Sequence, residues 1–196
     1  LMSLGLHRLW KKRFVETLNL KENEIILDVG SGSGDIASEI LKENLSTSLY
    51  LLDLNEEMLL EGRKRLKKEK NIKYFIGNAE KLNFENNFFD KYTISFCLRN
   101  ITEYLLSIKE AYRVLKPGGK YCCLEFSTPK SSLVSSSYKI YKSKILPFLG
   151  EIVAKDKNAY KYLSESIDLF PSQEELSKNL SAVSYTHLRA HETLQH

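Results

Sequence analysis

Residues 27–35 read LDVGSGSGD, a glycine-rich turn between a strand-like run and a helix-like segment. Gly30, Gly32 and Gly34 carry no Cβ atom and tolerate positive φ, so a small ligand can approach the backbone of the turn closely. The dinucleotide fingerprint places its third glycine three positions after the second, whereas the spacing here is two, which argues against a nicotinamide cofactor. A plain tight turn is the alternative to a ligand site.

On either side of this turn, short β-branched or aromatic runs alternate with charged segments of helical period. Strands are expected at 24–30, 48–54, 72–77, 89–96 and 119–126, and helices at 35–43, 55–68 and 103–115. Asn55 is the expected N-cap of the second helix, and KPGG (116–119) is expected to end the third and turn the chain. The alternation predicts a Rossmann-like, doubly wound α/β domain with a mostly parallel sheet.

Length and composition suit one globular domain. The chain has 196 residues, and its 29 Lys and Arg exceed its 25 Asp and Glu by a net charge of +4. No apolar run reaches the ~20 residues that a membrane-spanning helix needs. The first residues do not show the cationic region followed by an apolar core that is typical of a signal peptide, so we expect no secretory signal.

Three features that can indicate other functions have simpler explanations. The basic run RKRLKKEK (63–70) is interspersed with acidic residues on one expected helix, so we interpret it as a solvated face and expect no nucleic-acid partner. The cysteines form no C-x-x-C pair, which argues against a disulfide framework and a zinc site: Cys97, Cys122 and Cys123. His187 and His191 are spaced like two helical metal ligands, but no third ligand accompanies them, so no metal is expected.

The last third of the chain differs from the rest. Residues 131–180 are helical in character and rich in Lys, Tyr and Leu, and we expect them to form a lid that completes a domain of residues 1–180. Residues 181–196 fit neither helical nor strand periodicity and are expected to be a non-native or disordered tail.

Polar residues follow the expected strands at the edge where their carboxyl ends meet. Asp53 ends the second strand, where an acid can accept hydrogen bonds from both hydroxyls of a ribose; a helix-leading acid is the alternative. Asn78 and the backbone of Ala79 are placed to read an adenine edge, and Ser95 faces the same crevice. Asp28 and the amides of the turn can meet the amino and carboxylate groups of a methionine. A ligand with ribose and adenine but no pyrophosphate suits S-adenosylmethionine.

Four segments carry a resemblance to a known family. They read MSLGLHRLW (2–10), ISFCLRNI (94–101), RVLKPGGKYCCLEFS (113–127) and AYKYLSESI (159–167). The sequence closely resembles the ubiquinone/menaquinone biosynthesis C-methyltransferases, the UbiE-type branch of the class I methyltransferases, from residue 1 to about residue 180. That resemblance implies transfer of a methyl group from S-adenosylmethionine to a ring carbon of a polyprenyl benzoquinol or demethylmenaquinol. It also implies that Ser33 contacts the cofactor, together with Asp53, Asn78, Ala79 and Ser95.

The reaction needs a group that favours the phenolate, because a phenolic hydroxyl has a pKa near ~10. By resemblance Arg99 is the candidate that stabilises the phenolate, and Asn100 the residue that orients its oxygen. Glu125 and His7 are further acid/base candidates. A structural salt bridge for Arg99 and Glu125, and a packed His7, are the alternatives.

The resemblance also bears on partners and location. It implies a cytoplasmic protein, on the matrix side if mitochondrial, near the membrane that holds the quinol. Residues 131–154 combine apolar and lysine side chains, and we expect them to form the quinol pocket and to touch the membrane surface. A plain amphipathic helix is the alternative, and a homodimer or an assembly with other quinone-synthesis enzymes stays open. Methyltransferases of this class have two more strands after the fifth; we expect none here, which would expose residues 119–126 as a sheet edge.

Three other functions are alternatives to this one. They are methylation of another small molecule, a non-catalytic cofactor-binding scaffold in a quinone-synthesis assembly, and a nicotinamide dehydrogenase, which the glycine spacing disfavours.

Overall fold

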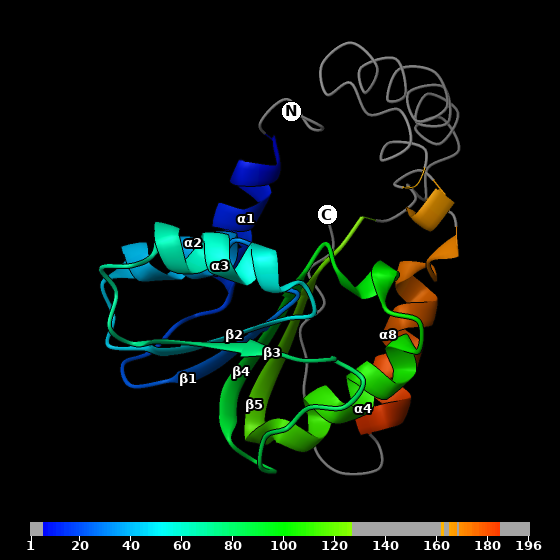
Figure 1. Ribbon diagram of the computed structural model, residues 1–196. Helices are drawn as coiled ribbons and strands as arrows, with labels where there is room; N and C mark the ends of the chain where they lie inside the picture. Colours follow the sequence, from blue (N-terminus) through cyan, green and yellow to red (C-terminus); the bar gives the residue numbers. More distant parts are fainter. Residues whose placement is uncertain (1–5, 127–161, 163–164, 168, 185–196) are drawn as a thin grey trace.

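The structure is a computed structural model that describes residues 6–126, 162, 165–167 and 169–184 (Figure 1). Five strands form one sheet: β1 (Ile25–Val29), β2 (Ser48–Asp53), β3 (Ile72–Ile76), β4 (Phe89–Ser95) and β5 (Leu115–Leu124). Their order is β3-β2-β1-β4-β5, and every neighbouring pair is parallel. The predicted Rossmann-like α/β fold is confirmed.

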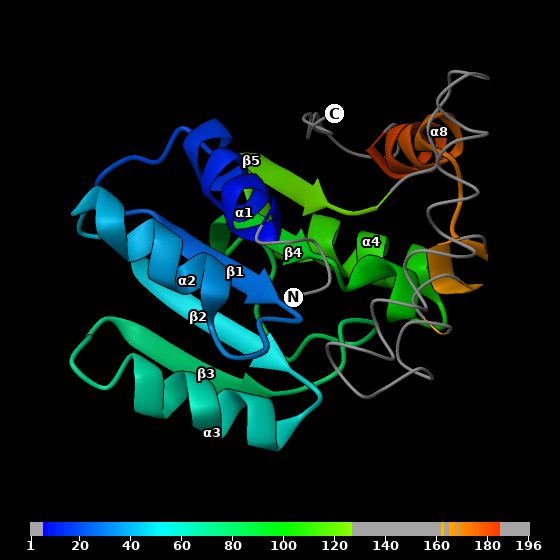
Figure 2. The ribbon, with the colours of Figure 1, turned by 90° about the horizontal axis from the view of Figure 1, so that it is seen from above.

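Helices cover both faces of this sheet (Figure 2). One face carries α1 (Leu6–Thr17), α2 (Asp35–Ile40) with the short 3-10 helix η1 (Leu41–Glu43), and α3 (Glu56–Arg65). The other face carries α4 (Tyr104–Val114) and α8 (Gln173–Ser184). A further 3-10 helix, η2 (Leu98–Asn100), follows β4.

The buried residues of β1 explain this layering. Successive strand side chains point to opposite faces, so Ile26 packs with α1 and α2 while Leu27 and Val29 pack toward α4 and α8. The strand is buried almost throughout, as expected for a parallel strand covered on both sides. Asp28 shares the face of Ile26, which brings a carboxylate under α1.

The turn from β2 into α3 follows the prediction. The side chain of Asn55 accepts a hydrogen bond from the backbone N–H of Met58 at 3.1 Å, so Asn55 is the N-cap. Acids occupy the first turn of α3 and bases its last turn, in the order that complements the helix dipole.

Three segments differ from the sequence-based expectations. α1 has no counterpart among the predicted helices. β5 begins at Leu115 instead of 119, because KPGG lies within the strand as an irregularity, where the register shifts between Phe89 and Lys91 of β4. α8 continues to Ser184, so the expected boundary at residue 180 falls inside a helix. Residues 131–161 and 185–196, where most of the lid and the tail were placed, lie outside the described residues.

Candidate functional site

The strand order creates a crevice at one end of the sheet. The chain runs from β1 to β2 and β3 on one side and then crosses to β4 on the other side of β1. In open parallel sheets, ligands bind outside the carboxyl ends of the strands at such a switch point. The predicted turn lies there, directly after β1.

The turn requires glycine at its first position. Gly30 has φ of +63°, and a Cβ atom placed on it would lie 2.2 Å from the sulfur of Cys97. No side chain fits in that space, so the loop after β4 closes directly onto the backbone of the turn. Gly32 and Gly34 also have positive φ.

Asp53 ties the turn to the end of β2. Its Oδ2 accepts the backbone N–H of Gly32 at 2.7 Å, and its Oδ1 accepts that of Asn55 at 2.9 Å. Each carboxylate oxygen has a second lone-pair site for a further donor. The carboxylate is therefore held in place and can still accept from hydroxyl groups of a ligand.

A pocket of about 190 Å³ opens beside Asp53, and we call it the crevice. It is bounded by the ends of β1 and β2 and by the loops after β3 and β4: Val29, Gly30, Leu52, Asp53, Leu54, Gly77, Asn78, Ala79, Glu80, Cys97, Asn100, Ile101 and Thr102. The structure thus brings Gly30, Asp53, Asn78, Ala79 and Asn100 of the predicted site together.

Asn78 is held by its neighbour in the loop after β3. Its Oδ1 accepts the backbone N–H of Glu80 at 2.9 Å, and its Nδ2 donates to Glu80 Oε2 at 3.0 Å. Glu80 Oε1 accepts the backbone N–H of Glu103 at 2.8 Å, which lowers the pKa of Glu80. The negative charge at the rim is therefore kept, which suits a cationic ligand.

Asp28 lies behind the turn and is fully buried. Thr93 Oγ1 donates to its Oδ1 at 2.8 Å, but none of the described residues donates to its Oδ2. Burial raises the pKa of Asp28 to about 7, although the Thr93 hydrogen bond and the charge of Lys11 oppose the shift. A buried carboxylate oxygen without a donor fits a ligand that brings an ammonium group.

Five predicted cofactor contacts do not line the crevice: Asp28, Gly32, Ser33, Gly34 and Ser95. Ser33 is half-buried in the turn, where its backbone lies against Gly62 of α3. Ser95 is half-buried at the end of β4, where it is paired with Leu124 of β5. The structure places both serines near the carboxyl edge without bringing them to the pocket beside Asp53.

Arg99 and Glu125 form a buried ion pair. Arg99 Nη1 donates to Glu125 Oε1 at 2.5 Å and to the carbonyl of Phe96 at 2.7 Å, and the two side chains are 8% and 4% exposed. Burial raises the pKa of Glu125, while Arg99 opposes that shift. This arrangement matches the structural alternative, in which each charge stabilises the other; Arg99 Nε has no acceptor among the described residues.

Asn100 lies at the rim of the crevice and is exposed. Its Oδ1 accepts a hydrogen bond from the hydroxyl of Tyr162 at 3.1 Å. Tyr162 therefore reaches the mouth of the crevice.

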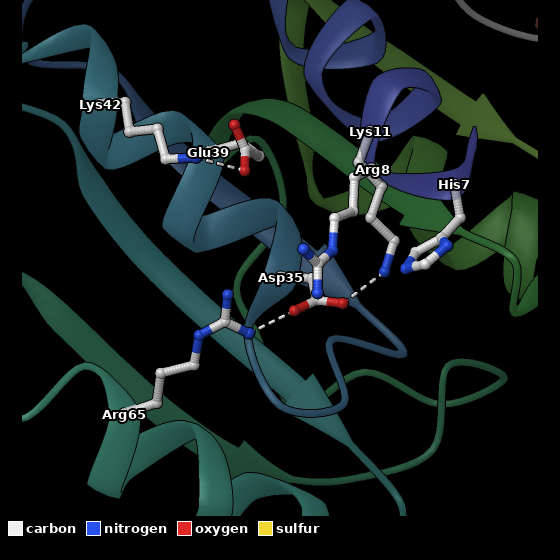
Figure 3. A pocket seen from close by; sticks show the side chains of 7 residues that line it. All are labelled: His7, Arg8, Lys11, Asp35, Glu39, Lys42 and Arg65. Carbon is white, nitrogen blue, oxygen red and sulfur yellow. Dashed lines mark hydrogen bonds and ion pairs between the residues drawn. The ribbon is translucent and has the colours of Figure 1, made fainter. Parts of the chain in front are cut away.

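His7 lies away from the crevice. It lines a separate hollow between α1, α2 and α3, which we call the basic groove (Figure 3). Burial, Lys11 and Arg8 lower the pKa of His7. The structure does not bring His7 to the residues around Asp53, because it lies on the face of α1 that turns toward α2.

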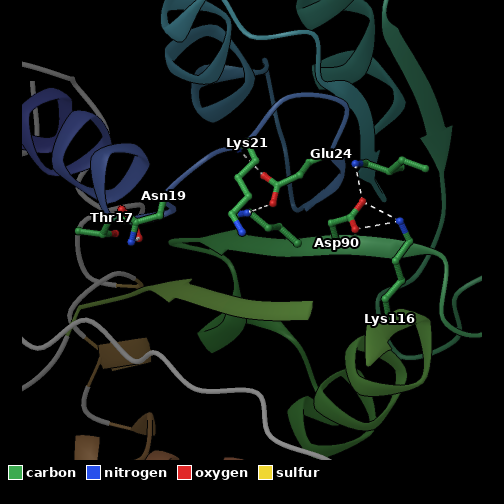
Figure 4. Close-up of polar contacts among 8 residues, drawn as sticks. Thr17, Asn19, Lys21, Glu24, Asp90 and Lys116 are labelled. Atoms are coloured by element: carbon green, nitrogen blue, oxygen red, sulfur yellow. Dashed lines mark hydrogen bonds and ion pairs between the residues drawn. The ribbon is translucent and has the colours of Figure 1, made fainter. Parts of the chain in front are cut away.

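A group of charged residues at the amino ends of the strands is structural (Figure 4). Asp90 Oδ2 accepts the backbone N–H of Ile25 at 2.9 Å, and Lys116 Nζ donates to both Asp90 oxygens at 2.8 Å. Glu24 pairs with the buried Lys91. These contacts join β1, β4 and β5 at the edge opposite the crevice.

Sequence reasoning missed two features of the site. Cys97 was not among the predicted site residues, yet it lines the crevice against Gly30, where burial raises the pKa of its thiol to about 12. Glu80 orders Asn78 and carries the rim charge. The acid two positions after Asn78 was a signal for the second feature; nothing local in the sequence indicated the first.

The fold is shared with solved structures, several of which are named methyltransferases. The YcgJ protein from Bacillus subtilis matches with a TM-score of 0.68 at 19% identity, covering 91% of this chain and 68% of that one. A SAM-dependent methyltransferase from Aquifex aeolicus matches with a TM-score of 0.57 at 24% identity, covering 64% of this chain and 70% of that one. The strand order, the glycine turn and the acid at the end of β2 define a class I methyltransferase.

The family follows from the sequence comparison. The model of the ubiE/COQ5 methyltransferase family matches residues 1–193, and the chain belongs to this family. The Ubiquinone/menaquinone biosynthesis C-methyltransferase UbiE of Rickettsia bellii (strain RML369-C) is 50% identical over 183 residues, which cover 89% of this chain and 73% of the relative. The protein of that name from Rickettsia prowazekii (strain Madrid E) matches to the same extent.

Proposed function

We propose that the protein is an S-adenosylmethionine-dependent C-methyltransferase that acts on a ring carbon of a polyprenyl benzoquinol or demethylmenaquinol. The observation that carries the proposal is 50% identity to relatives named Ubiquinone/menaquinone biosynthesis C-methyltransferase UbiE, across 89% of the chain.

We assign the crevice to S-adenosylmethionine. Asp53 would accept from the ribose hydroxyls, and Asn78 with Ala79 would meet the adenine. The free Oδ2 of Asp28 supports a role in binding the methionine ammonium group, because a buried acceptor without a donor is costly unless a ligand satisfies it. Gly30, Gly32 and Gly34 shape the turn that contains Ser33, and Ser95 ends the neighbouring strand β4.

When bound, S-adenosylmethionine supplies an electrophilic methyl group. The chain must hold the quinol so that its ring carbon faces that methyl and must favour loss of the phenolic proton. Asn100, exposed at the rim, would orient the phenolic oxygen. The unpaired Nε of Arg99 supports a role in stabilising negative charge beside the crevice, with Glu125 fixing the guanidinium.

The same proposal covers partners and location. We place the enzyme in the cytoplasm, or in the mitochondrial matrix if it is eukaryotic, at the inner face of the membrane that holds its quinol, with residues 131–154 as the contact. A homodimer and an assembly with other quinone-synthesis enzymes are further proposals. None of the described helices is both long and apolar enough to cross a bilayer.

Two measurements, made one after the other, test the proposed function. Calorimetry should detect binding of S-adenosylmethionine and no binding of NAD. With S-adenosylmethionine present, the protein should then methylate a short-chain demethylmenaquinol or a methoxy-benzoquinol. Cofactor binding without methyl transfer to either quinol would contradict the proposal and favour a scaffold or a methyltransferase for another small molecule.

A further inference from the structure

The basic groove lies on the outer side of the helical layer and is separate from the crevice. It has a volume of about 480 Å³ and shares no lining residue with the crevice. α2 turns Ile36, Ala37 and Ile40 toward the sheet, so its other side, with Asp35 and Glu39, faces the groove. Figure 3 shows side chains from α1, from the α2–η1 segment and from α3 pointing into this one hollow.

The groove carries more positive than negative charge. Its four cations are Arg8, Lys11, Lys42 and Arg65, and its two carboxylates are Asp35 and Glu39. With His7 neutral, the excess is two positive charges. Although burial opposes the shift, Lys11 and Arg65 lower the pKa of Asp35 to about 2. Asp35 is therefore ionised near neutral pH, as the count of two excess positive charges assumes.

Both carboxylates already have cationic partners. Asp35 pairs with Lys11 at 2.5 Å and also with Arg65, and Glu39 pairs with Lys42 at 2.5 Å. Arg8 is exposed and forms no ion pair with a residue that the structure describes. The guanidinium of Arg8 therefore lies in the hollow with no carboxylate partner among the described residues.

We propose that the basic groove binds a phosphate group carried by a larger molecule, with Arg8 as its main ligand and Lys42 at the opposite end. A phosphate offers several acceptor oxygens and up to two negative charges, which matches the excess, and arginine binds such groups through paired N–H donors. The volume leaves room for the rest of the molecule. A phosphate of this kind occurs in soluble esters and in the headgroups of anionic lipids; Leu9, next to Arg8 and 49% exposed, would meet the bilayer in the second case.

The test measures binding of two probes to the whole chain. Sodium pyrophosphate is titrated by calorimetry, and vesicles of phosphatidylglycerol or phosphatidylcholine are tested by flotation. Arg8→Gln and Lys42→Gln each remove one groove cation. Arg13→Gln is the matched control, because Arg13 is an exposed arginine on the same helix that does not line the groove.

We expect the wild-type protein to bind pyrophosphate, phosphatidylglycerol vesicles or both, and not phosphatidylcholine. Arg8→Gln should weaken that binding about tenfold, as expected for one charge-assisted hydrogen bond, and Lys42→Gln should also weaken it. Arg13→Gln should leave it unchanged. Binding to pyrophosphate alone would identify a soluble ligand, and binding to vesicles alone a lipid headgroup.

Three outcomes would overturn the proposal. They are no binding of either probe, binding that Arg8→Gln leaves intact, and an equal loss in Arg8→Gln and Arg13→Gln, which would indicate diffuse surface charge. Thermal melts and S-adenosylmethionine titrations of each variant separate these outcomes from misfolding and from any failure of the proposed methyltransferase activity.

Discussion

The sulfur of Cys97 lies 2.2 Å from the position that a Cβ atom would occupy on Gly30. The loop after β4 thus contacts the backbone of the glycine turn directly, and the two segments that bound the crevice depend on each other. This contact makes residue 30 more sensitive to substitution than other glycines with positive φ.

Gly30→Ala should therefore distort the crevice and destabilise the protein. Gly118→Ala is the matched control, because Gly118 also has positive φ but a Cβ there would meet nothing within 4 Å. We expect the control to cost about 1 kcal/mol of unfolding free energy and Gly30→Ala clearly more, with loss of S-adenosylmethionine binding. Urea unfolding and calorimetry measure both effects, and equal costs for the two variants would contradict the argument.

Asp53→Ala should lower the affinity for S-adenosylmethionine by at least about tenfold, because it removes the ribose acceptor and releases Gly32. Asp53→Asn keeps one acceptor oxygen and should lose less. Glu57→Gln, an exposed acid in the first turn of α3, is the control and should bind normally. If calorimetry finds an unchanged affinity of Asp53→Ala for S-adenosylmethionine, the carboxylate of Asp53 does not bind the cofactor.

Breaking the Arg99–Glu125 pair should be costly, because the remaining charge would be buried alone. Glu125→Gln is expected to lower the free energy of unfolding by about 3 kcal/mol or more. The double replacement Arg99→Met with Glu125→Leu should lower the free energy of unfolding by less than a single replacement that leaves one charge unpaired. If Arg99 also acts on the quinol, the double variant will fold and bind S-adenosylmethionine but fail to transfer methyl groups. Full activity in a folded double variant would leave the pair a purely structural role.

Asp28 should make stability depend on pH. Its folded pKa of about 7 exceeds the ordinary value of about 3.9, so the folded state holds a proton that the unfolded state releases between these values. Stability from this group is therefore complete below pH 4 and falls as pH rises to 7, by at most about 4 kcal/mol. Asp28→Asn should unfold at higher urea than the wild type at pH 8, and the difference should shrink toward pH 5. A difference that does not change with pH would exclude Asp28 as its source.

The parts that the sequence predicted correctly are those set by local chemistry. Alternating apolar runs gave all five strands, and Asn55 capped α3 because its side chain and the following acids define a helix start on their own. The start of β5 was predicted wrongly at 119, because Pro117 and two glycines indicate a turn in isolation, while Leu115 and Lys120 on either side pair with β4 and keep that stretch within the strand.

Contacts between distant segments were harder to predict. Asp53 ends β2, and Asn78 and Ala79 follow β3, so the parallel topology alone brings them to one edge of the sheet. The contact of Cys97 with Gly30 and the position of His7 in the basic groove depend on how η2 and α1 pack, which no local pattern specifies. The position of Arg99 after β4 was predicted correctly. Its ion pair with Glu125 was one of two interpretations, and a catalytic role was the other.

The hydrogen bond from Gly32 to Asp53 holds the glycine turn against the end of β2. Little backbone freedom is therefore left for the turn to lose when a nucleoside binds. Binding of the cofactor should then cost little conformational entropy in this part of the protein. Larger conformational changes should be confined to the side where the quinol enters.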